Sequence, residues 1–318
     1  MKRVVVQAPC STSNLGPGFD VFGLALDILH DIAEVEVLDE NRVLLKIEGV
    51  EAQRIPTNPQ RNSAGRAALE FMKRHGSAGV KIKLLKGVPP GSGLGSTGTS
   101  AAATVVAMNY LFETELSNRD LVEIAAQGEI AAAGAPHADN VAPSIFGGLT
   151  IISSYNPLRV TSFPPPRNLV FSIALPKGIR KTTRKARAVL PKNVELSKTI
   201  RNLGSSSLVL AGLLLSNPRL LGEGMMGDVI VEPKRIPLYP GCLEAKSAAI
   251  DAGATGATLS GAGPTIIAAV DPESVDPREV ANAMREAFIT QGIECEGYVG
   301  RPTEGAKVID RDSMISRE

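Results

Sequence analysis

The chain has 318 residues, of which 43% are hydrophobic, and its 34 Lys and Arg residues nearly balance its 33 Asp and Glu residues. This length suits one or two domains with a sizeable core, and the even charge predicts neither a nucleic-acid nor a membrane partner. No run of about 18 apolar residues is present, so no membrane span is predicted. The three cysteines are far apart and form no CxxC pair, which argues against a disulfide framework or a zinc site and favours the cytoplasm.

The first half of the chain is predicted to mix short strands with three helices. Segments with β-branched residues or alternating polarity predict strands at 3–9, 33–38, 43–49, 80–85 and 147–154. Segments with helical spacing predict helices at 62–76, 96–112 and 117–132. Asn62 and Ser63 are candidate caps of the first helix, and Gly76 is its stop signal.

Three consecutive prolines, Pro164 to Pro166, mark a predicted boundary between two domains, because proline fits neither a helix interior nor a central strand. Beyond it, strands are predicted at 169–175, 256–261, 264–270 and 295–300. Helices are predicted at 181–190, 194–216, 241–253 and 276–292. Because strands and helices do not alternate strictly, the second half is predicted to be of the α+β class.

The most informative segment is a glycine-rich run at residues 89–100, PPGSGLGSTGTS, which leads directly into an alanine-rich helix. Glycine lets a backbone approach a ligand closely, and a helix N-terminus offers unpaired N–H groups to an anion. The run therefore predicts a phosphate-binding loop, although its glycine content fits a flexible turn equally well. It lacks the lysine of a P-loop, and no acidic strand end follows it as in the dinucleotide fold.

The order of residues in this run resembles the motif P-x-x-x-G-L-G-S-S-A-A of the GHMP kinases, a family of small-molecule kinases. It departs from that motif at Thr97, Gly98 and Thr99. Two further segments resemble the other motifs of the family: APCSTSNLGPGFDVFGLAL at 8–26 and LSGAGPTIIA at 259–268. The resemblance covers the chain from end to end. It implies an α+β GHMP kinase fold, with a ribosomal-S5-like nucleotide-binding domain at 1–163 and a ferredoxin-like domain at 164–318.

Three shorter segments resemble one branch of that family, the branch that phosphorylates the side-chain hydroxyl of L-homoserine on the route to threonine. They are NLGPGFD, HADNVAPSIFGG and VEPKRIPLYPG. The resemblance implies a cytoplasmic homodimer that uses ATP as co-substrate and Mg²⁺ as cofactor. It also implies direct in-line transfer, since no general base is identified.

The resemblance assigns several residues to the nucleotide and the metal. Asn62 would touch the adenine, and Lys86 would help to stabilise the transferred phosphoryl group. Glu129 would hold Mg²⁺ together with Ser96 or Thr97. The phosphates would lie along Pro89, Pro90, Gly91, Ser92, Gly93, Leu94, Gly95, Ser96, Thr97, Gly98 and Thr99. The plainer interpretation of Glu129 is an ordinary helix surface residue.

The resemblance also assigns the amino-acid site. Arg187 and Arg235 would bind the carboxylate, for which the planar guanidinium fork is suited. Asp20 would bind the amino-acid end, and Asn140 would lie nearest the attacking hydroxyl. Asn14 and His137 would line the pocket, Asp139 would support its loop, and Thr183 and Gly261 would lie at its rim.

Plainer interpretations of these residues stay open. Arg184 is close enough in sequence to replace Arg187 as the carboxylate ligand, and the basic run that holds both is typical of a solvated helix face. His137 fits a solvated loop residue, and Asp20 fits a helix cap.

Two alternative functions are weighed against this one. The first is another GHMP kinase, such as a mevalonate kinase, which would need no acceptor for an ammonium group; the paired arginines and the segment HADNVAPS argue against it. The second is a non-catalytic relative that binds ligands without transferring phosphate, which would be expected to have lost Glu129 or the glycine loop.

Overall fold

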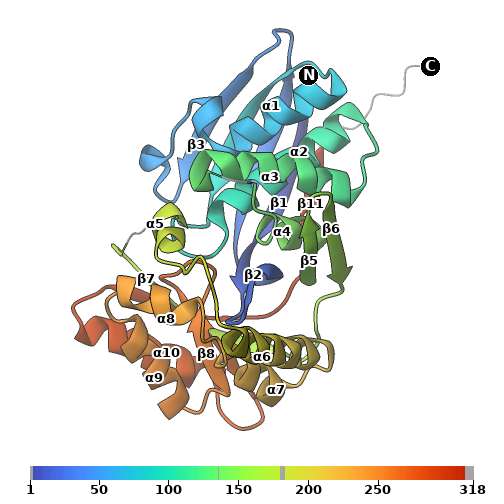
Figure 1. The fold of residues 1–318 in the computed structure, drawn as a ribbon. Helices are drawn as coiled ribbons and strands as arrows, with labels where there is room; N and C mark the ends of the chain where they lie inside the picture. Colours follow the sequence, from blue (N-terminus) through green and yellow to red (C-terminus); the bar gives the residue numbers. More distant parts are fainter. Residues whose placement is uncertain (1–2, 135, 180–182, 312–318) are drawn as a thin grey trace.

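The structure of the protein is a computed structural model that describes residues 3–134, 136–179 and 183–311. The chain forms two β-sheets, each covered by helices (Figure 1). Within the described ranges no helix is long and apolar enough to cross a membrane.

The first sheet belongs to the N-terminal half of the chain, with one strand from the far C-terminus. Its strands are β1 (Arg3–Asn14), β2 (Gly18–Leu38), β3 (Val43–Gly49), β4 (Gly79–Lys86), β5 (Leu149–Tyr155), β6 (Leu158–Phe163) and β11 (Lys307–Arg311). Their order is β11-β1-β2-β4-β3, and β5 pairs with both β2 and β6. Only β3 and β4 pair in parallel; the other pairs are antiparallel.

Helices pack on this sheet around one apolar core. They are α1 (Ser63–His75), α2 (Ser96–Phe112), α3 (Asn118–Ala133) and α4 (Val141–Phe146), and two short 3₁₀ turns, η1 (Ala52–Arg54) and η2 (Pro59–Arg61), precede them. Helix α2 is rich in Ala and Val on all sides, and it is buried between strands β1 and β2 and helices α1 and α3. Its N-terminus is therefore held rigidly where the glycine-rich run leaves the sheet.

The second sheet has the order β10-β7-β9-β8 and is antiparallel throughout. Its strands are β7 (Val170–Pro176), β8 (Gly256–Leu259), β9 (Ile266–Val270) and β10 (Cys295–Gly300). With α9 (Cys242–Asp251) and α10 (Pro277–Thr290) on one face, it forms the β-α-β-β-α-β arrangement of a ferredoxin-like domain.

The opposite face of the second sheet is covered as well. The remaining helical segments are α5 (Thr183–Ala188), α6 (Leu196–Leu214), α7 (Pro218–Met225), α8 (Glu232–Arg235) and the 3₁₀ turn η3 (Ile236–Leu238). Along β7, Phe171, Ile173 and Leu175 pack in one cluster with α6, α7 and β2, whereas Ala174 packs in another with α9 and α10. Strand β7 is buried on both faces for this reason.

The predicted α+β fold with two parts is confirmed, while several elements differ from the prediction. The boundary expected between residues 163 and 164 falls between β6 and β7, which lie in different sheets. Strand β11, which was not predicted, returns to pair with β1, so the C-terminal segment covers an edge of the first sheet. Strand β2 begins at Gly18 rather than near residue 33, and β6, α4, α7 and α8 were also missed.

Candidate active site

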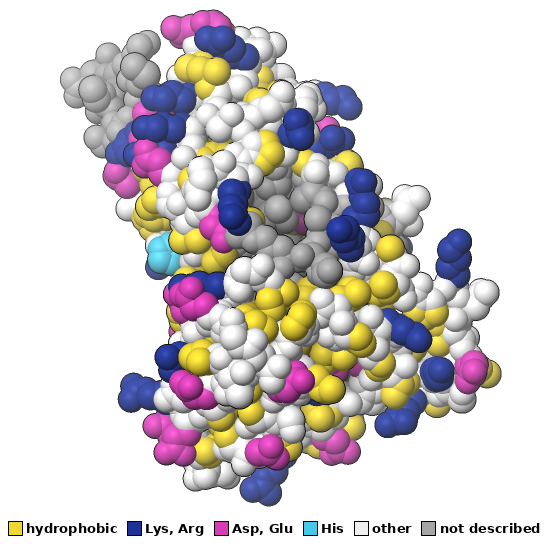
Figure 2. Space-filling view, turned by 90° about the vertical axis from the view of Figure 1, so that its left-hand side faces the viewer, with side chains coloured by type: hydrophobic (Ala, Val, Ile, Leu, Met, Phe, Trp, Pro, Cys, Tyr) yellow, Lys and Arg dark blue, Asp and Glu magenta, His cyan; other side chains and the backbone are white. Residues whose placement is uncertain are grey.

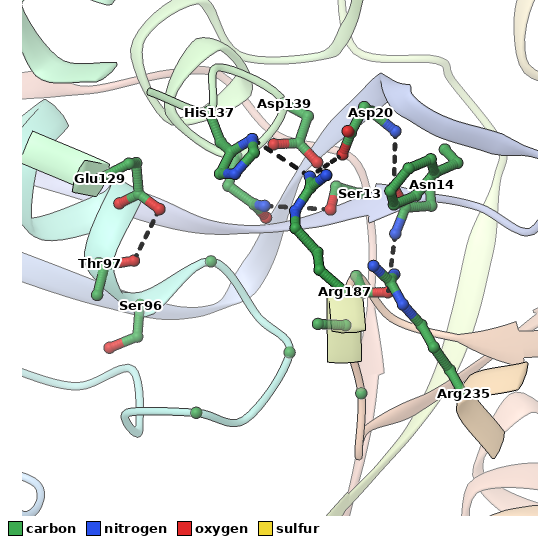
Figure 3. Close-up of a pocket in the computed structure, with 18 of the residues that line it drawn as sticks. Ser13, Asn14, Asp20, Ser96, Thr97, Glu129, His137, Asp139, Arg187 and Arg235 are labelled. Atoms are coloured by element: carbon green, nitrogen blue, oxygen red, sulfur yellow. Dashed lines mark hydrogen bonds and ion pairs between the residues drawn. The ribbon is translucent and has the colours of Figure 1, made fainter. Parts of the chain in front are cut away.

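A cavity of about 390 Å³ is lined by residues from both parts of the chain (Figure 3). Most of the predicted site residues line it: Asn14, Asp20, Pro90, Gly91, Gly93, Gly95, Ser96, Thr97, Glu129, His137, Asp139, Asn140, Arg187, Arg235 and Gly261. These residues come from the β1–β2 turn, the glycine-rich run, α3, the segment before α4, α5, α8 and the turn after β8. The tertiary fold therefore brings all three glycine motifs to one place.

At one end of the cavity the glycine-rich run presents backbone rather than charged side chains. Gly91, Gly93 and Gly95 all have positive φ angles. A Cβ atom at Gly93 would lie 2.5 Å from the Ser260 carbonyl oxygen, and one at Gly95 would lie 2.3 Å from Ser11 Oγ. Helix α2 then begins with no side-chain cap, so N–H groups of its first turn can be offered to an anion.

Glu129 faces the start of α2 from helix α3. Its Oε2 accepts a hydrogen bond from Thr97 Oγ1 at 3.0 Å, and its side chain points toward Thr97 in Figure 3. The residue is only 7% exposed, and Oε1 has no partner within the described part of the chain. Burial raises the pKa of Glu129 to about 7, and the nearby Asp139 adds to the rise, while the Thr97 hydrogen bond opposes it. A cation at Oε1 would relieve this cost.

Ser96 does not share this orientation. Its hydroxyl donates to the Val88 carbonyl oxygen at 2.8 Å and bonds with Lys86 Nζ at 2.9 Å, beneath the run. Of the two candidate hydroxyls, Thr97 is therefore the one beside Glu129.

Some predicted nucleotide residues lie away from the cavity. Lys86 is buried in an ion pair with Asp31, so the direct phosphoryl contact expected for Lys86 does not agree with the structure. The side chain of Asn62 caps α1 by accepting from Ala64 and Gly65 N–H groups, and it is not among the residues that line the cavity.

Five further residues of the run serve its packing or line a second hollow beside it. Leu94 and Thr99 are fully buried, and the backbone of Gly98 packs against Asn140. Pro89 and Ser92 line a separate hollow on the opposite side of the run.

The other end of the cavity is dense in charged side chains. Arg187, on α5, forms an ion pair with Asp20, and its Nη2 lies 3.2 Å from His137 Nδ1. Burial, and then the adjacent Arg187, lower the pKa of His137, so the imidazole is neutral and accepts at Nδ1.

Arg235 approaches the same end from α8. It is 2% exposed, and its guanidinium donates to the carbonyl oxygens of Ala186 and Gly261, both at 3.2 Å. Burial lowers its pKa, and the neighbouring Arg187 lowers it further. The guanidinium carbons of Arg187 and Arg235 lie 5.0 and 4.8 Å from the centre of the Phe19 ring, so one aromatic side chain steadies both.

Between the two ends lie amides and a second buried carboxyl. Asn140 accepts from Ser11 Oγ and donates to Ser13 Oγ, each at 3.1 Å. Asn14 donates to the Gly261 carbonyl oxygen at 2.8 Å, which ties the first motif to the third. Burial, and then the nearby Asp20, raise the pKa of Asp139 to about 6.

The structure also distinguishes between the two candidate arginines of α5. Arg187 lines the cavity, whereas Arg184 is exposed and does not line it. Thr183 begins α5, but its side chain lies outside the described residues.

Sequence reasoning missed five residues that line the cavity, namely Ser13, Phe19, Lys185, Ala262 and Gly263. Four of them lie inside the quoted motifs, so position within a motif is the signal that could have found them.

Comparison with known protein families identifies the class of protein. Residues 62–148 match the family model "GHMP kinases N terminal domain", and residues 209–290 match "GHMP kinases C terminal". Together these regions cover more than half of the chain, in the order that the fold requires. The chain belongs to the GHMP kinase family.

Comparison with individual proteins shows members of the family that the chain resembles in sequence and structure. The chain is 42% identical to a homoserine kinase of Methanococcus vannielii over 91% of its own length and 94% of that protein. It is 40% identical to a homoserine kinase of Methanocella arvoryzae over 98% and 99% of the two chains. The crystal structure of a homoserine kinase from Cytophaga hutchinsonii is 36% identical, with a TM-score of 0.89 over 96% and 97%. A mevalonate kinase of Leishmania major shares the fold, with a TM-score of 0.70 at 16% identity.

Proposed function

We propose that this chain is an ATP-dependent kinase that phosphorylates the side-chain hydroxyl of L-homoserine to give O-phospho-L-homoserine. The observation that carries the proposal is the single cavity that joins a glycine loop and Glu129 at one end to paired arginines and Asp20 at the other. Homoserine kinases at about 40% identity over nearly the whole chain support the same reaction.

The glycine end suits the triphosphate of ATP. Gly93 and Gly95, where positive φ favours glycine, place no side chain beside the loop. The uncapped start of α2 offers N–H donors and partial positive charge. Backbone dipoles therefore do the binding, which explains why the run carries no lysine of its own.

The pair Thr97 and Glu129 fits a Mg²⁺ ion. A carboxylate with an unpartnered buried oxygen and an adjacent hydroxyl are the oxygen ligands that this ion prefers. No cluster of three or more His, Cys, Asp or Glu side chains that could hold a metal occurs among the described residues, so phosphate oxygens would complete the shell. When bound, the ion would neutralise charge that develops on the transferred group.

The charged end suits a zwitterionic amino acid. We assign the carboxylate of homoserine to Arg187 and Arg235, and its ammonium group to Asp20 with Asp139. A ligand held in this way places its side-chain hydroxyl toward Asn140, which lies between the arginine cluster and Gly95 at the end of the loop. Because both charged groups of homoserine are on its α-carbon, holding them at this end of the cavity directs the hydroxyl at the other end of the molecule toward the phosphate.

Transfer can then proceed in line, with positioning as the main source of catalysis, because the transition state of phosphoryl transfer is loose. Asn140 would orient the hydroxyl. Asp139, with its pKa raised to about 6, is adjacent to Asn140 in the chain and could also take up the proton, so its replacement by Asn is informative. A fall in kcat would mark it as the proton acceptor, whereas a rise in KM for homoserine alone would mark it as a ligand of the ammonium group.

A coupled assay of ADP release with homoserine, mevalonate and shikimate tests the proposed function. We expect turnover with homoserine and no more than background with the other two alcohols. Equal rates with mevalonate would point to a different branch of the family, and no ADP release with any alcohol would point to a non-catalytic relative.

We also propose that the enzyme works in the cytoplasm as a homodimer. All three cysteines are buried free thiols, as suits a reducing compartment. Leu196, Ile200 and Leu203 of α6 are 73%, 61% and 66% exposed and share one helix face, which suits contact with a second copy. On the face drawn in Figure 2, which is the left-hand side of Figure 1, hydrophobic side chains lie among charged ones over the lower part of the molecule. Sedimentation equilibrium of the wild type and of Leu203→Glu tests the dimer.

A further inference from the structure

Beneath the glycine-rich run lies a buried carboxylate that the proposed mechanism does not use. Asp31, on β2, is fully buried, and it sits one position beyond the last β2–β4 pair, Ile32 with Leu85. Burial of a carboxylate costs free energy unless the group is fully hydrogen-bonded and paired with a cation. The partners of Asp31 therefore indicate its role.

One carboxylate oxygen of Asp31 binds residues 87 and 88, which lead into the glycine-rich run and are called its first stem here. Oδ1 accepts hydrogen bonds from the N–H groups of Gly87 and Val88, both at 3.0 Å. These two residues are where the chain leaves β4, so their direction sets the path of the glycines that follow.

The other carboxylate oxygen binds the second stem, which is the start of α2 at residues 96–100. Oδ2 accepts from Ser100 Oγ at 2.7 Å and forms an ion pair with Lys86 Nζ. Lys86 Nζ in turn donates to the carbonyl oxygen of Ser96 at 3.1 Å, and Ser96 and Ser100 belong to the first turns of α2. A single carboxylate therefore fastens both stems of the loop, and residues 89–95 arch between them.

This arrangement differs from ordinary packing, because the two stems meet each other mainly through charged and hydroxyl groups. Ser96 Oγ also donates a hydrogen bond to the Val88 carbonyl oxygen at 2.8 Å, so the second stem is bonded directly to the first. The middle of the loop is held by other groups: Leu94 is buried, and the Gly93 carbonyl oxygen accepts a hydrogen bond from Ser260 Oγ at 2.8 Å. The Asp31 group instead joins the two ends of the loop to each other.

We propose that Asp31 is a positioning residue for the nucleotide: together with Lys86 it sets the spacing of the loop stems, so that the N–H groups of the loop and of α2 are arranged for the phosphates before ATP arrives. The inference rests on the proposed function, in that the loop must bind ATP. Preorganisation of this kind lowers the cost of binding without touching the ligand.

The test compares Asp31→Asn, Ser100→Ala and the double variant Asp31→Asn/Lys86→Met with wild type. Titration calorimetry gives the Kd for ADP, steady-state kinetics give KM for ATP and for homoserine, and thermal melts give Tm. We expect Asp31→Asn to weaken ADP at least tenfold, and Ser100→Ala about threefold, with KM for homoserine changed less than twofold.

The double variant separates positioning from stability. It has no unpaired buried charge, so its Tm should recover toward the wild-type value, whereas ADP affinity should stay weak because Ser96 is no longer tied to β4. Thr104→Val is the matched control: its buried hydroxyl donates to the Ser100 carbonyl oxygen at 2.9 Å, one turn further along α2. It should lower Tm without changing the Kd for ADP.

Wild-type ADP affinity in Asp31→Asn and Ser100→Ala would overturn the inference, as would recovery of ADP affinity together with Tm in the double variant. If Asp31→Asn does not fold, Ser100→Ala and the double variant decide. Failure of the wild type itself to bind ADP would instead overturn the proposed function.

Discussion

In the proposed function, the two ends of the cavity bind charge by different means. At the nucleotide end, binding groups come from one continuous stretch, residues 90–97, and are mostly backbone N–H groups, with Glu129 as the one carboxylate beside them. At the amino-acid end they are side chains from separate elements, with Arg187 on α5 and Arg235 on α8. Local chain geometry builds the first end, and the packing of distant elements builds the second. Substitutions at the two ends should therefore fail in different ways.

The largest effect is expected where a side chain would fill the loop. Gly93→Val and Gly95→Val should abolish ATP binding, because valine disfavours positive φ and its Cβ would lie 2.5 Å or less from neighbouring atoms. Calorimetry with an ATP analogue is the measurement, and circular dichroism checks the fold. Gly91→Ala is the matched control, since Gly91 has positive φ but no atom within 4 Å of a Cβ. Near-normal affinity in both valine variants would show that the loop is only a turn.

Loss of the single carboxylate at the nucleotide end should be nearly as damaging. Glu129→Gln is expected to lower kcat by about a hundredfold or more, because the amide cannot hold Mg²⁺ as a carboxylate does, while the fold stays intact. The measurement is kcat as a function of Mg²⁺ concentration. Glu123→Gln on the same helix, where the side chain is half-buried and faces Arg74, should be neutral. An unchanged rate with unchanged Mg²⁺ dependence would remove Glu129 from the mechanism.

At the amino-acid end, the loss of one arginine side chain should change KM for homoserine but not KM for ATP. Arg235→Ala and Arg187→Ala each leave the carboxylate of homoserine partly unpaired, at a cost of roughly 2–5 kcal/mol. KM for homoserine should therefore rise about 30-fold or more, with KM for ATP little changed.

Controls at this end test whether the planar fork matters. Arg184→Ala, which changes an exposed residue on the same helix, should do much less, and Arg235→Lys should rescue poorly. An analogue of homoserine without the carboxylate should respond little to either arginine change. A dominant effect from Arg184 would mean that the carboxylate site is misassigned.

The smallest effect concerns stability rather than rate. The pKa of Glu129 is raised from 4.5 to about 7 on folding, so the folded protein binds the proton more tightly than the unfolded chain does. Stability from this group is therefore present below about pH 4.5 and is lost as the pH rises through 7. Without Mg²⁺, Glu129→Gln should be more stable than wild type by roughly 2–3 kcal/mol at pH 8, and the gap should close near pH 5.

Urea unfolding of both proteins at pH 5 and pH 8 measures this difference. Asp139 is present in both proteins, and the repulsion that it exerts on Glu129 is part of the measured difference. A gap that does not change between the two pH values would mean that Glu129 is not a strained, protonatable carboxyl.

The sequence by itself determined the glycine loop, the order of the three motifs and most of the helices, because the signals for these features lie within a few residues of one another. Asn62 caps α1, Gly76 ends it in the left-handed conformation, and Ser117 and Asp120 form a capping box at α3. Each of these interactions is local, and so are the backbone angles that make residues 89–95 a loop.

Only the tertiary structure decided which side chains of a segment face the cavity. Ser96 and Thr97 are neighbours, yet one turns beneath the loop and the other toward Glu129. Lys86 pairs with Asp31 on another strand, and β11 reaches β1 across the whole chain. The direction of a side chain depends on what packs against it. The partners of Thr97 and Lys86 lie 32 and 55 residues away in the chain, where no pattern in the local sequence identifies them.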